Sequence, residues 1–199
     1  MIPRRTILAA LAAVSATTAA AQSQPDKMPG GADQAYVAQS LAISSVTLAA
    51  SRMAAKKAQS DDLKEFAQLE EAEQMTLADV LKSMPAGNAG VAGRTVSQPG
   101  QTEVEQNLDQ RGREILERLR TEPAGADFDR AYMGMLATGH LELLRIQEAY
   151  LDSGQNNANL VTVAKLARGT IKEHLQLLTD IESDMESASA TTGAAPEKN

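Results

Sequence analysis

The sequence predicts an all-α protein built around a four-helix bundle, and two observations support this prediction. Apolar residues recur at steps of three and four along most of the chain, which is the period of an amphipathic helix and not of a strand. Aromatic residues make up only 3% of the 199 residues, so Ala, Leu and Met carry most of the apolar character. β-Sandwiches prefer β-branched and aromatic residues, whereas small and unbranched residues suit closely packed helices.

The first two long helices are expected to form an antiparallel hairpin. The first spans residues 33–57, with Asp33 as its N-cap. It has no charged residue between Asp33 and Arg52, but its many Ser, Thr and Gln residues make it too polar for a membrane span. Ser60 predicts the N-cap of the second helix, which ends at Pro85. A link this short forces the two helices to run in opposite directions.

The third and fourth long helices have the clearest helical period. They occupy residues 128–183, and a short polar turn containing Gly154 joins them. Asp127 predicts the N-cap of the third helix, and Gly154 predicts a glycine C-cap at its end. The apolar stripe of this pair comprises Phe128, Met133, Leu136, Leu143, Leu144, Leu151, Leu160, Ala164, Ala167, Ile171, Leu178, Ile181 and Met185.

A long crossover separates the second helix from the third. Residues 85–101 form a Gly- and Pro-rich loop, and residues 102–121 are predicted to be an extra helix opened by a capping box at Thr102. The extra helix has only a thin apolar stripe, so we expect it to lie across the outside of the bundle. A crossover of roughly forty residues lets the second and third long helices run parallel, as in a ferritin-like four-helix bundle.

The N-terminus resembles a secretory signal. A short basic region containing Arg4 and Arg5 precedes an uncharged run to Ala21, which ends in an A-x-A cleavage site. We therefore expect a signal peptide at residues 1–21 and Sec-type export to the periplasm; the twin-arginine route is less favoured because the residues usually found around the arginine pair are missing. The remaining divisions are a flexible leader at residues 22–32, the bundle at residues 33–186 and a disordered tail at residues 187–199.

The net charge and the absence of cysteine argue against several classes of function. The formal net charge of −7 opposes binding to nucleic acid. The chain has no cysteine, and therefore no disulfide, no thiol chemistry and no lipidated cysteine. It also lacks a recognisable catalytic set, so we do not expect an enzyme. The leading hypothesis is a non-catalytic envelope protein that binds an unknown protein partner or acts in envelope stress. Its oligomeric state stays open.

One polar layer is predicted inside the bundle. Thr47, Gln74, His140 and His174 each lie near the midpoint of a long helix, and both histidines, the only two in the chain, fall on apolar stripes. The simplest interpretation is a hydrogen-bonded core layer of neutral histidines, which fixes helix register and needs no cofactor.

A metal site is the alternative interpretation of this layer. His140 and His174, together with Glu70 or Glu73, would supply two imidazoles and a carboxylate, which suit a divalent ion of zinc, copper or iron. A ferritin-type di-iron centre is excluded, because neither histidine follows a glutamate in a Glu-x-x-His pattern and the first helix lacks an acid at its midpoint.

Several segments resemble one bacterial family, the domain of unknown function 4142. They are FDRAY at residues 128–132, His140, the His174-Leu175 pair and, more loosely, MAAKKA at residues 53–58 and LKEFAQ at residues 63–68. The resemblance implies an exported, ferritin-like helical protein, and members are often labelled outer membrane proteins. It implies no reaction, cofactor or catalytic residue.

The resemblance covers residues 35–182, and two positions depart from the family pattern. Members commonly carry an acidic residue where this chain has Thr47, and an Asp-His pair where it has Glu73 and Gln74. Both departures argue against a metal role that the ferritin-like shape alone would suggest.

Overall fold

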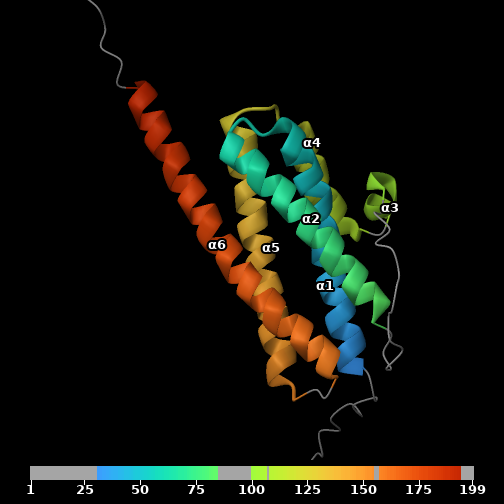
Figure 1. Cartoon of the computed structure of the whole chain (residues 1–199). Coiled ribbons are helices and arrows are strands. Elements are labelled where there is room, and N and C mark those ends of the chain that lie inside the picture. The colour runs from blue at the N-terminus through green and yellow to red at the C-terminus, as the bar shows by residue number, and fades with distance from the viewer. Residues whose placement is uncertain (1–30, 85–99, 107, 155–156, 194–199) are drawn as a thin grey trace, which may run out of the picture.

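The computed structural model describes residues 31–84, 100–106, 108–154 and 157–193, and this part of the chain is all-α (Figure 1). The predicted signal peptide and nearly all of the leader lie outside the described residues, as does most of the loop after the second helix. The described helices are α1 (Gly31–Lys57), α2 (Asp61–Ser83), α3 (Gln101–Gln106), α4 (Gln110–Thr121), α5 (Ala126–Asp152) and α6 (Ala158–Gly193).

Four long helices pack around a common centre. α1 and α2 form one antiparallel hairpin and α5 and α6 form another, while α1 also packs against α5 and α2 against α6. α2 and α5 run in the same direction (Figure 1), as the long crossover allows. α4 packs against α1 and α5. None of the helices in the described ranges is both long enough and apolar enough to span a bilayer.

The start of α1 differs from the prediction. The helix begins at Gly31, so Asp33 lies inside the first turn and is not the N-cap. Its carboxylate instead accepts hydrogen bonds from the Tyr150 hydroxyl, at 2.7 Å, and from Nδ2 of Asn157, at 3.2 Å. Asp33 therefore ties the start of α1 to the turn between α5 and α6.

The turn between α1 and α2 is held by two side chains. Oγ of Ser60 accepts a hydrogen bond from the Leu63 amide at 3.2 Å, which confirms the predicted N-cap. The carboxylate of Asp129, on α5, accepts from the amides of Gln59 and Ser60 at 2.9 Å. Asp129 is 1% exposed, so this buried acid clamps the first hairpin onto the second.

The extra helix predicted at residues 102–121 is two helices, and the prediction of one is wrong. α4 restarts at Asp109, whose carboxylate caps it by accepting from the Gly112 amide at 2.7 Å. Thr102 lies within the first turn of α3 and is not its cap. α4 approaches α1 closely, because a Cβ atom built on Gly112 would lie only 2.8 Å from a methyl group of Val46. The ammonium group of Lys57 donates to the last carbonyls of α4.

The second hairpin is longer than predicted. α5 begins at Ala126, so Asp127 is in its first turn and does not cap it. Gly154 has φ +68°, the left-handed conformation expected of a C-cap glycine. α6 continues to Gly193, so residues 187–193 are helical rather than part of a disordered tail, and its C-terminal end projects beyond the other helices (Figure 1).

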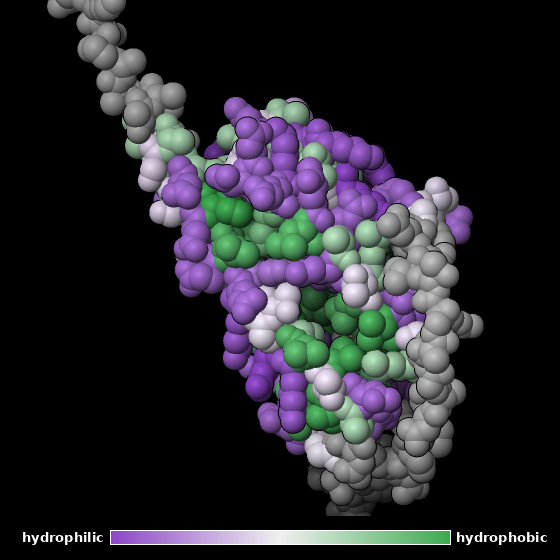
Figure 2. Space-filling model, in the orientation of Figure 1, coloured by the Kyte–Doolittle hydropathy of each residue, from purple (hydrophilic) through white to green (hydrophobic). Residues whose placement is uncertain are grey.

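Two apolar clusters fill the interior. One includes Leu63, Phe66 and Leu136, and the other includes Tyr36, Leu81 and Leu160. On the surface, the face in Figure 2 shows two hydrophobic areas separated by polar side chains. The large apolar residues exposed among the described residues are Leu69, Leu141, Leu166 and Leu177.

Candidate metal centre

A buried polar cluster lies in the middle of the bundle. α2 supplies Glu70 and Gln74, α5 supplies His140 and α6 supplies His174. Glu70 is fully buried, His140 and His174 are 1% and 3% exposed, and Gln74 is 6% exposed. Polar groups buried this deeply need partners, because water cannot solvate them.

Helical spacing explains how these side chains meet. Glu70 follows Phe66 and Ala67 on the buried face of α2, and Gln74 lies one turn further on. His140 is four residues after Leu136, and His174 is three after Ile171, so each ring replaces one apolar side chain in a buried stripe. The side chain of Gln74 donates to Oε1 of Glu70 at 2.7 Å, which fixes the carboxylate and leaves its other oxygen facing the histidines.

Three ligand atoms converge at the centre of this cluster. Oε2 of Glu70 lies 2.8 Å from Nδ1 of His174 and 3.4 Å from Nε2 of His140. The two ring nitrogens are 3.1 Å apart. These three side chains form a group whose ligand atoms could hold a metal ion.

The ring nitrogens that face away from Glu70 are Nδ1 of His140 and Nε2 of His174. Their contacts indicate which nitrogens carry hydrogen. Nδ1 of His140 is 2.9 Å from the carbonyl oxygen of Leu136, which can only accept, so this nitrogen carries hydrogen. Nε2 of His174 is 2.9 Å from Oε2 of Glu73, a second acceptor, so it carries hydrogen as well. In neutral imidazoles, the inner nitrogens therefore present lone pairs to each other and to Glu70. The centre of the cluster needs one positive charge, either a proton or a metal ion.

The shifted pKa values of the cluster residues also indicate that a positive charge lies among them. Burial would raise the pKa of Glu70, but the two adjacent imidazoles outweigh burial and lower that pKa to about 2. Burial would likewise lower the pKa of His174, but the carboxylates of Glu70, Glu73 and Glu173 raise it above its usual range. For Glu73, burial dominates and raises the pKa. Glu70 is therefore anionic across the physiological pH range and attracts a cation.

Two aromatic side chains lie near the cluster. The edge of Phe66 packs against His174, with ring centroids 5.2 Å apart. The fully buried Tyr132 lies close enough for Glu70 to influence its ionisation, and its hydroxyl is 2.8 Å from Oγ of Ser51. Burial, only partly offset by the Ser51 hydrogen bond, raises the pKa of Tyr132 well above its usual value, so its hydroxyl stays protonated.

The predicted site residues fall into three groups. Glu70, His140 and His174 converge, and Glu73 reaches the far nitrogen of His174 without joining the central group. Gln74 contacts Glu70. Thr47 is 1% exposed, but its hydroxyl has no hydrogen-bond partner among the described residues. The two departures from the family pattern, at Thr47 and at Glu73-Gln74, therefore replace none of the three converging ligand atoms.

Sequence reasoning missed several buried polar partners. Gln147 accepts a hydrogen bond from the Tyr36 hydroxyl at 2.6 Å, and Ser51 bonds to Tyr132. The sequence also gives no indication that Asp129 caps the turn between α1 and α2. Gln147 lies four residues after Leu143, and Asp129 immediately follows Phe128, so their positions beside apolar stripes were the available signal.

Comparison with known proteins gives one match. Neither the curated proteins nor the solved structures contain a sequence or fold that matches this chain. The model of one family, described as Domain of unknown function (DUF4142), matches residues 15–181. Since this match covers most of the chain, the protein belongs to the DUF4142 family.

Proposed function

We propose that the protein is a non-catalytic metal-binding protein of the cell envelope that holds one divalent transition-metal ion between Glu70, His140 and His174. One observation carries the proposal: three fully or nearly fully buried ligand atoms converge within 3.4 Å of one another. The outer contacts, a hydrogen bond at His140 and an ion pair at His174, direct the lone pairs of both rings inward. The negative charge of a buried carboxylate beside two such rings is not compensated unless a cation lies among them.

The geometry accommodates such an ion. The three ligand atoms are 2.8–3.4 Å apart, so bonds of about 2.1 Å from all three residues to the same ion would be possible. Two imidazoles and one carboxylate suit zinc, copper or iron. Glu73, which contacts the far nitrogen of His174, would orient that ring from outside the coordination sphere.

We also propose a periplasmic location and a ferritin-like bundle for the protein. The basic and apolar N-terminal residues support a Sec-type signal peptide and a periplasmic address. The parallel course of α2 and α5 across a long crossover supports a ferritin-like bundle (Figure 1). Fractionation of cells expressing the full chain checks the address: recovery of a shortened protein in the periplasmic fraction is expected, and recovery of the full-length chain in the cytoplasm contradicts it.

A structural role is the second candidate, and the raised pKa of His174 favours it. In this alternative, a proton on Nδ1 of His174 compensates Glu70, and the cluster sets the register of the helices between the two apolar clusters. The alternative needs no ligand, so metal binding separates the two candidates.

The test uses full-chain protein purified without an affinity tag and stripped with a chelator. Zn²⁺, Cu²⁺ and, without oxygen, Fe²⁺ are titrated while thermal unfolding is recorded. We expect one ion per chain for at least one metal and a higher melting temperature, since a ligand at 100 times its Kd adds about 2.7 kcal/mol of stability. His140→Gln and His174→Gln should lose both effects, whereas Glu173→Gln, which changes an exposed neighbour, should keep them. Absence of any stabilisation by these metals would leave the structural role.

A further inference from the structure

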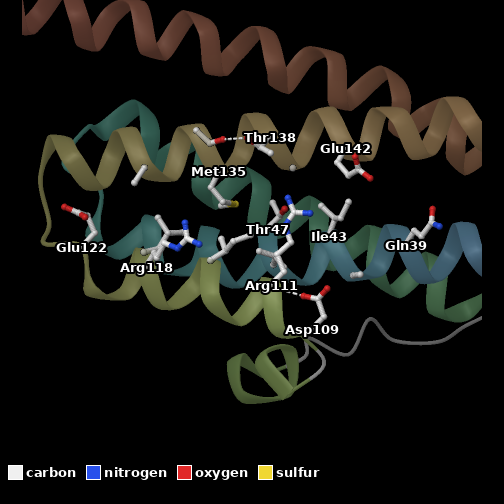
Figure 3. Close-up of a pocket in the computed structure, with 18 of the residues that line it drawn as sticks. Gln39, Ile43, Thr47, Asp109, Arg111, Arg118, Glu122, Met135, Thr138 and Glu142 are labelled. Carbon is white, nitrogen blue, oxygen red and sulfur yellow. Dashed lines mark hydrogen bonds between the residues drawn. The ribbon is translucent and has the colours of Figure 1, made fainter.

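A second site lies outside the metal centre, in a groove between α1, α4 and α5. The groove has a volume of about 780 Å³, a size typical of small-molecule sites (Figure 3). Its floor is apolar and comes from all three helices: Ile43 and Val46 of α1, Ile115 of α4, and Met135 and Ile146 of α5.

Two arginines of α4 face this groove. Arg111, Ile115 and Arg118 follow the i, i+4, i+7 spacing of a single helix face, and the two arginines are therefore about 10 Å apart along α4. Figure 3 shows both side chains extending from α4 into the groove. Neither guanidinium forms an ion pair or a hydrogen bond with another described residue. In a protein with a net charge of −7, two unpaired cations beside an apolar floor are complementary to an anion.

The acidic residues around the groove form no ion pair with these arginines, although Glu142 interacts electrostatically with Arg111. The carboxylate of Asp109 caps α4 through the Gly112 amide. Glu142 forms an ion pair with Arg145 at 2.6 Å. Glu122 lies at the end of the groove, beyond Arg118 (Figure 3).

A buried hydroxyl also lines the groove. Thr47 is 1% exposed, and its Oγ1 has no hydrogen-bond partner among the described residues. Gly139 of α5 lies opposite, so close that a Cβ atom there would be 3.7 Å from this oxygen. Leaving a buried hydroxyl unpaired costs free energy, and a ligand with an acceptor near Thr47 would recover it.

We propose that this groove binds a single-chain anionic amphiphile, with its hydrocarbon chain on the apolar floor and its head group between Arg111 and Arg118. The hydroxyl of Thr47 donates to the head group. Guanidinium groups pair with carboxylates and phosphates alike, so the shared requirement is an anionic head on one alkyl chain. The groove does not include Glu70, His140 or His174, so the proposal stands independently of the metal centre.

Calorimetric titration of the full chain with four C12 compounds tests the proposal. Laurate and dodecyl phosphate carry an anionic head, dodecanol a neutral one and dodecyltrimethylammonium a cationic one, all used below their micelle concentrations. We expect one anionic amphiphile to bind at one per chain and at least tenfold more tightly than dodecanol and the cation. The tighter of the two anionic compounds identifies the head group as carboxylate or phosphate. Equal binding of anionic, neutral and cationic compounds, or no binding of either anionic compound, overturns the proposal.

Variants distinguish the two halves of the site. Replacing both Arg111 and Arg118 with Met keeps their apolar stems, and should weaken the anionic ligand at least tenfold while leaving dodecanol unchanged. Gly134→Leu should abolish binding of every C12 compound, since Gly134 lines the groove and a Cβ atom there meets nothing within 4 Å. Gly169→Leu is the matched control, because Gly169 is an equally open helical glycine of α6 outside the groove. Unchanged anionic binding in the double arginine variant or in Gly134→Leu overturns the proposal.

Sedimentation of the same variants tests whether a second copy of the chain occupies the groove instead. We expect Gly134→Leu and the unmodified chain to have the same oligomeric state. If the unmodified chain is a dimer that Gly134→Leu dissociates, the groove is a contact between two copies of the chain and the proposed ligand site is wrong.

Discussion

Glu70 and His174 meet at 2.8 Å in the centre of the bundle, from helices separated by about a hundred residues of sequence. The carboxylate is fully buried and the imidazole nearly so. Nε2 of His174 already faces Glu73, so the nitrogen that faces Glu70 has either a proton or a metal ion beside it. The stability of the fold and the proposed binding of metal are therefore linked through one contact.

Replacing Glu70 with Gln should destabilise the metal-free protein. The substitution keeps the size of the side chain but removes the anion that compensates the buried imidazole, and breaking a buried pair in this way costs about 3–5 kcal/mol. Urea unfolding in the presence of a chelator measures the change. Glu65→Gln, at an exposed position of the same helix, is the control and should change stability by no more than about 0.5 kcal/mol. Similar stabilities for the two variants would show that Glu70 does not compensate the histidines.

Replacing Glu73 with Gln should weaken metal binding without abolishing it. Glu73 contacts the outer nitrogen of His174, and loss of such an outer-shell partner typically reduces metal affinity by about 10- to 100-fold. Competition with a chromophoric chelator measures the affinity. Complete loss of binding, as expected for His174→Gln, would place Glu73 among the direct ligands, and an unchanged affinity would remove it from the site.

The metal-free protein should be most stable at mildly acidic pH. The pKa of Glu70 falls from 4.5 in the unfolded chain to about 2, so its stabilising contribution is present above pH 4.5 and is lost as the pH falls towards 2. The pKa of His174 is raised above 6.5, so its contribution is complete below pH 6.5 and is lost as the pH rises through the folded-state pKa.

Unfolding free energies measured with a chelator between pH 3 and pH 9 would check this profile. His174→Gln should remove the decline above pH 6.5 and serves as the control. A stability that keeps rising in the unmodified protein between pH 6.5 and pH 9 would be inconsistent with a protonated His174 beside Glu70.

Replacing Asp129 with Asn should destabilise the bundle but leave metal affinity unchanged. The buried carboxylate accepts from the amides of Gln59 and Ser60, and an amide side chain has a single acceptor oxygen for these donors. We expect a loss of about 1–3 kcal/mol in thermal or urea unfolding. Asp127→Asn, at an exposed position of the same turn, should have a much smaller effect. A clear loss of metal affinity in Asp129→Asn would mean that the clamp and the metal centre are coupled.

Periodicity in the sequence predicted the long helices and their buried faces well. The steps of three and four that place Leu136 and Ile171 in the interior also place His140 and His174 there, and the structure buries both. Predictions from single residues are confirmed where that residue determines the local conformation, as at the Ser60 cap and at Gly154.

The remaining features depend on contacts between distant residues, which periodicity does not reveal. Asp33 looks like a cap in sequence, but its partners Tyr150 and Asn157 come from the second hairpin. The break between α3 and α4 depends on Asp109, which competes as a helix cap inside an otherwise continuous helical pattern. Helical spacing places Glu70, and not Glu73, on the buried stripe of α2. The contact of Glu73 with the far nitrogen of His174 depends on how α6 packs beside α2, which periodicity does not reveal.

X-ray absorption spectroscopy of the zinc-loaded full chain identifies the ligands of the ion, because it reports the atoms bound to the metal. We expect one ion per chain with two imidazole nitrogens and at least one oxygen at about 2.0–2.1 Å, and loss of the imidazole signal in the His140→Gln, His174→Gln double variant. Failure to load an ion, or a shell of oxygen atoms without imidazole scattering, would contradict a metal centre formed by Glu70, His140 and His174.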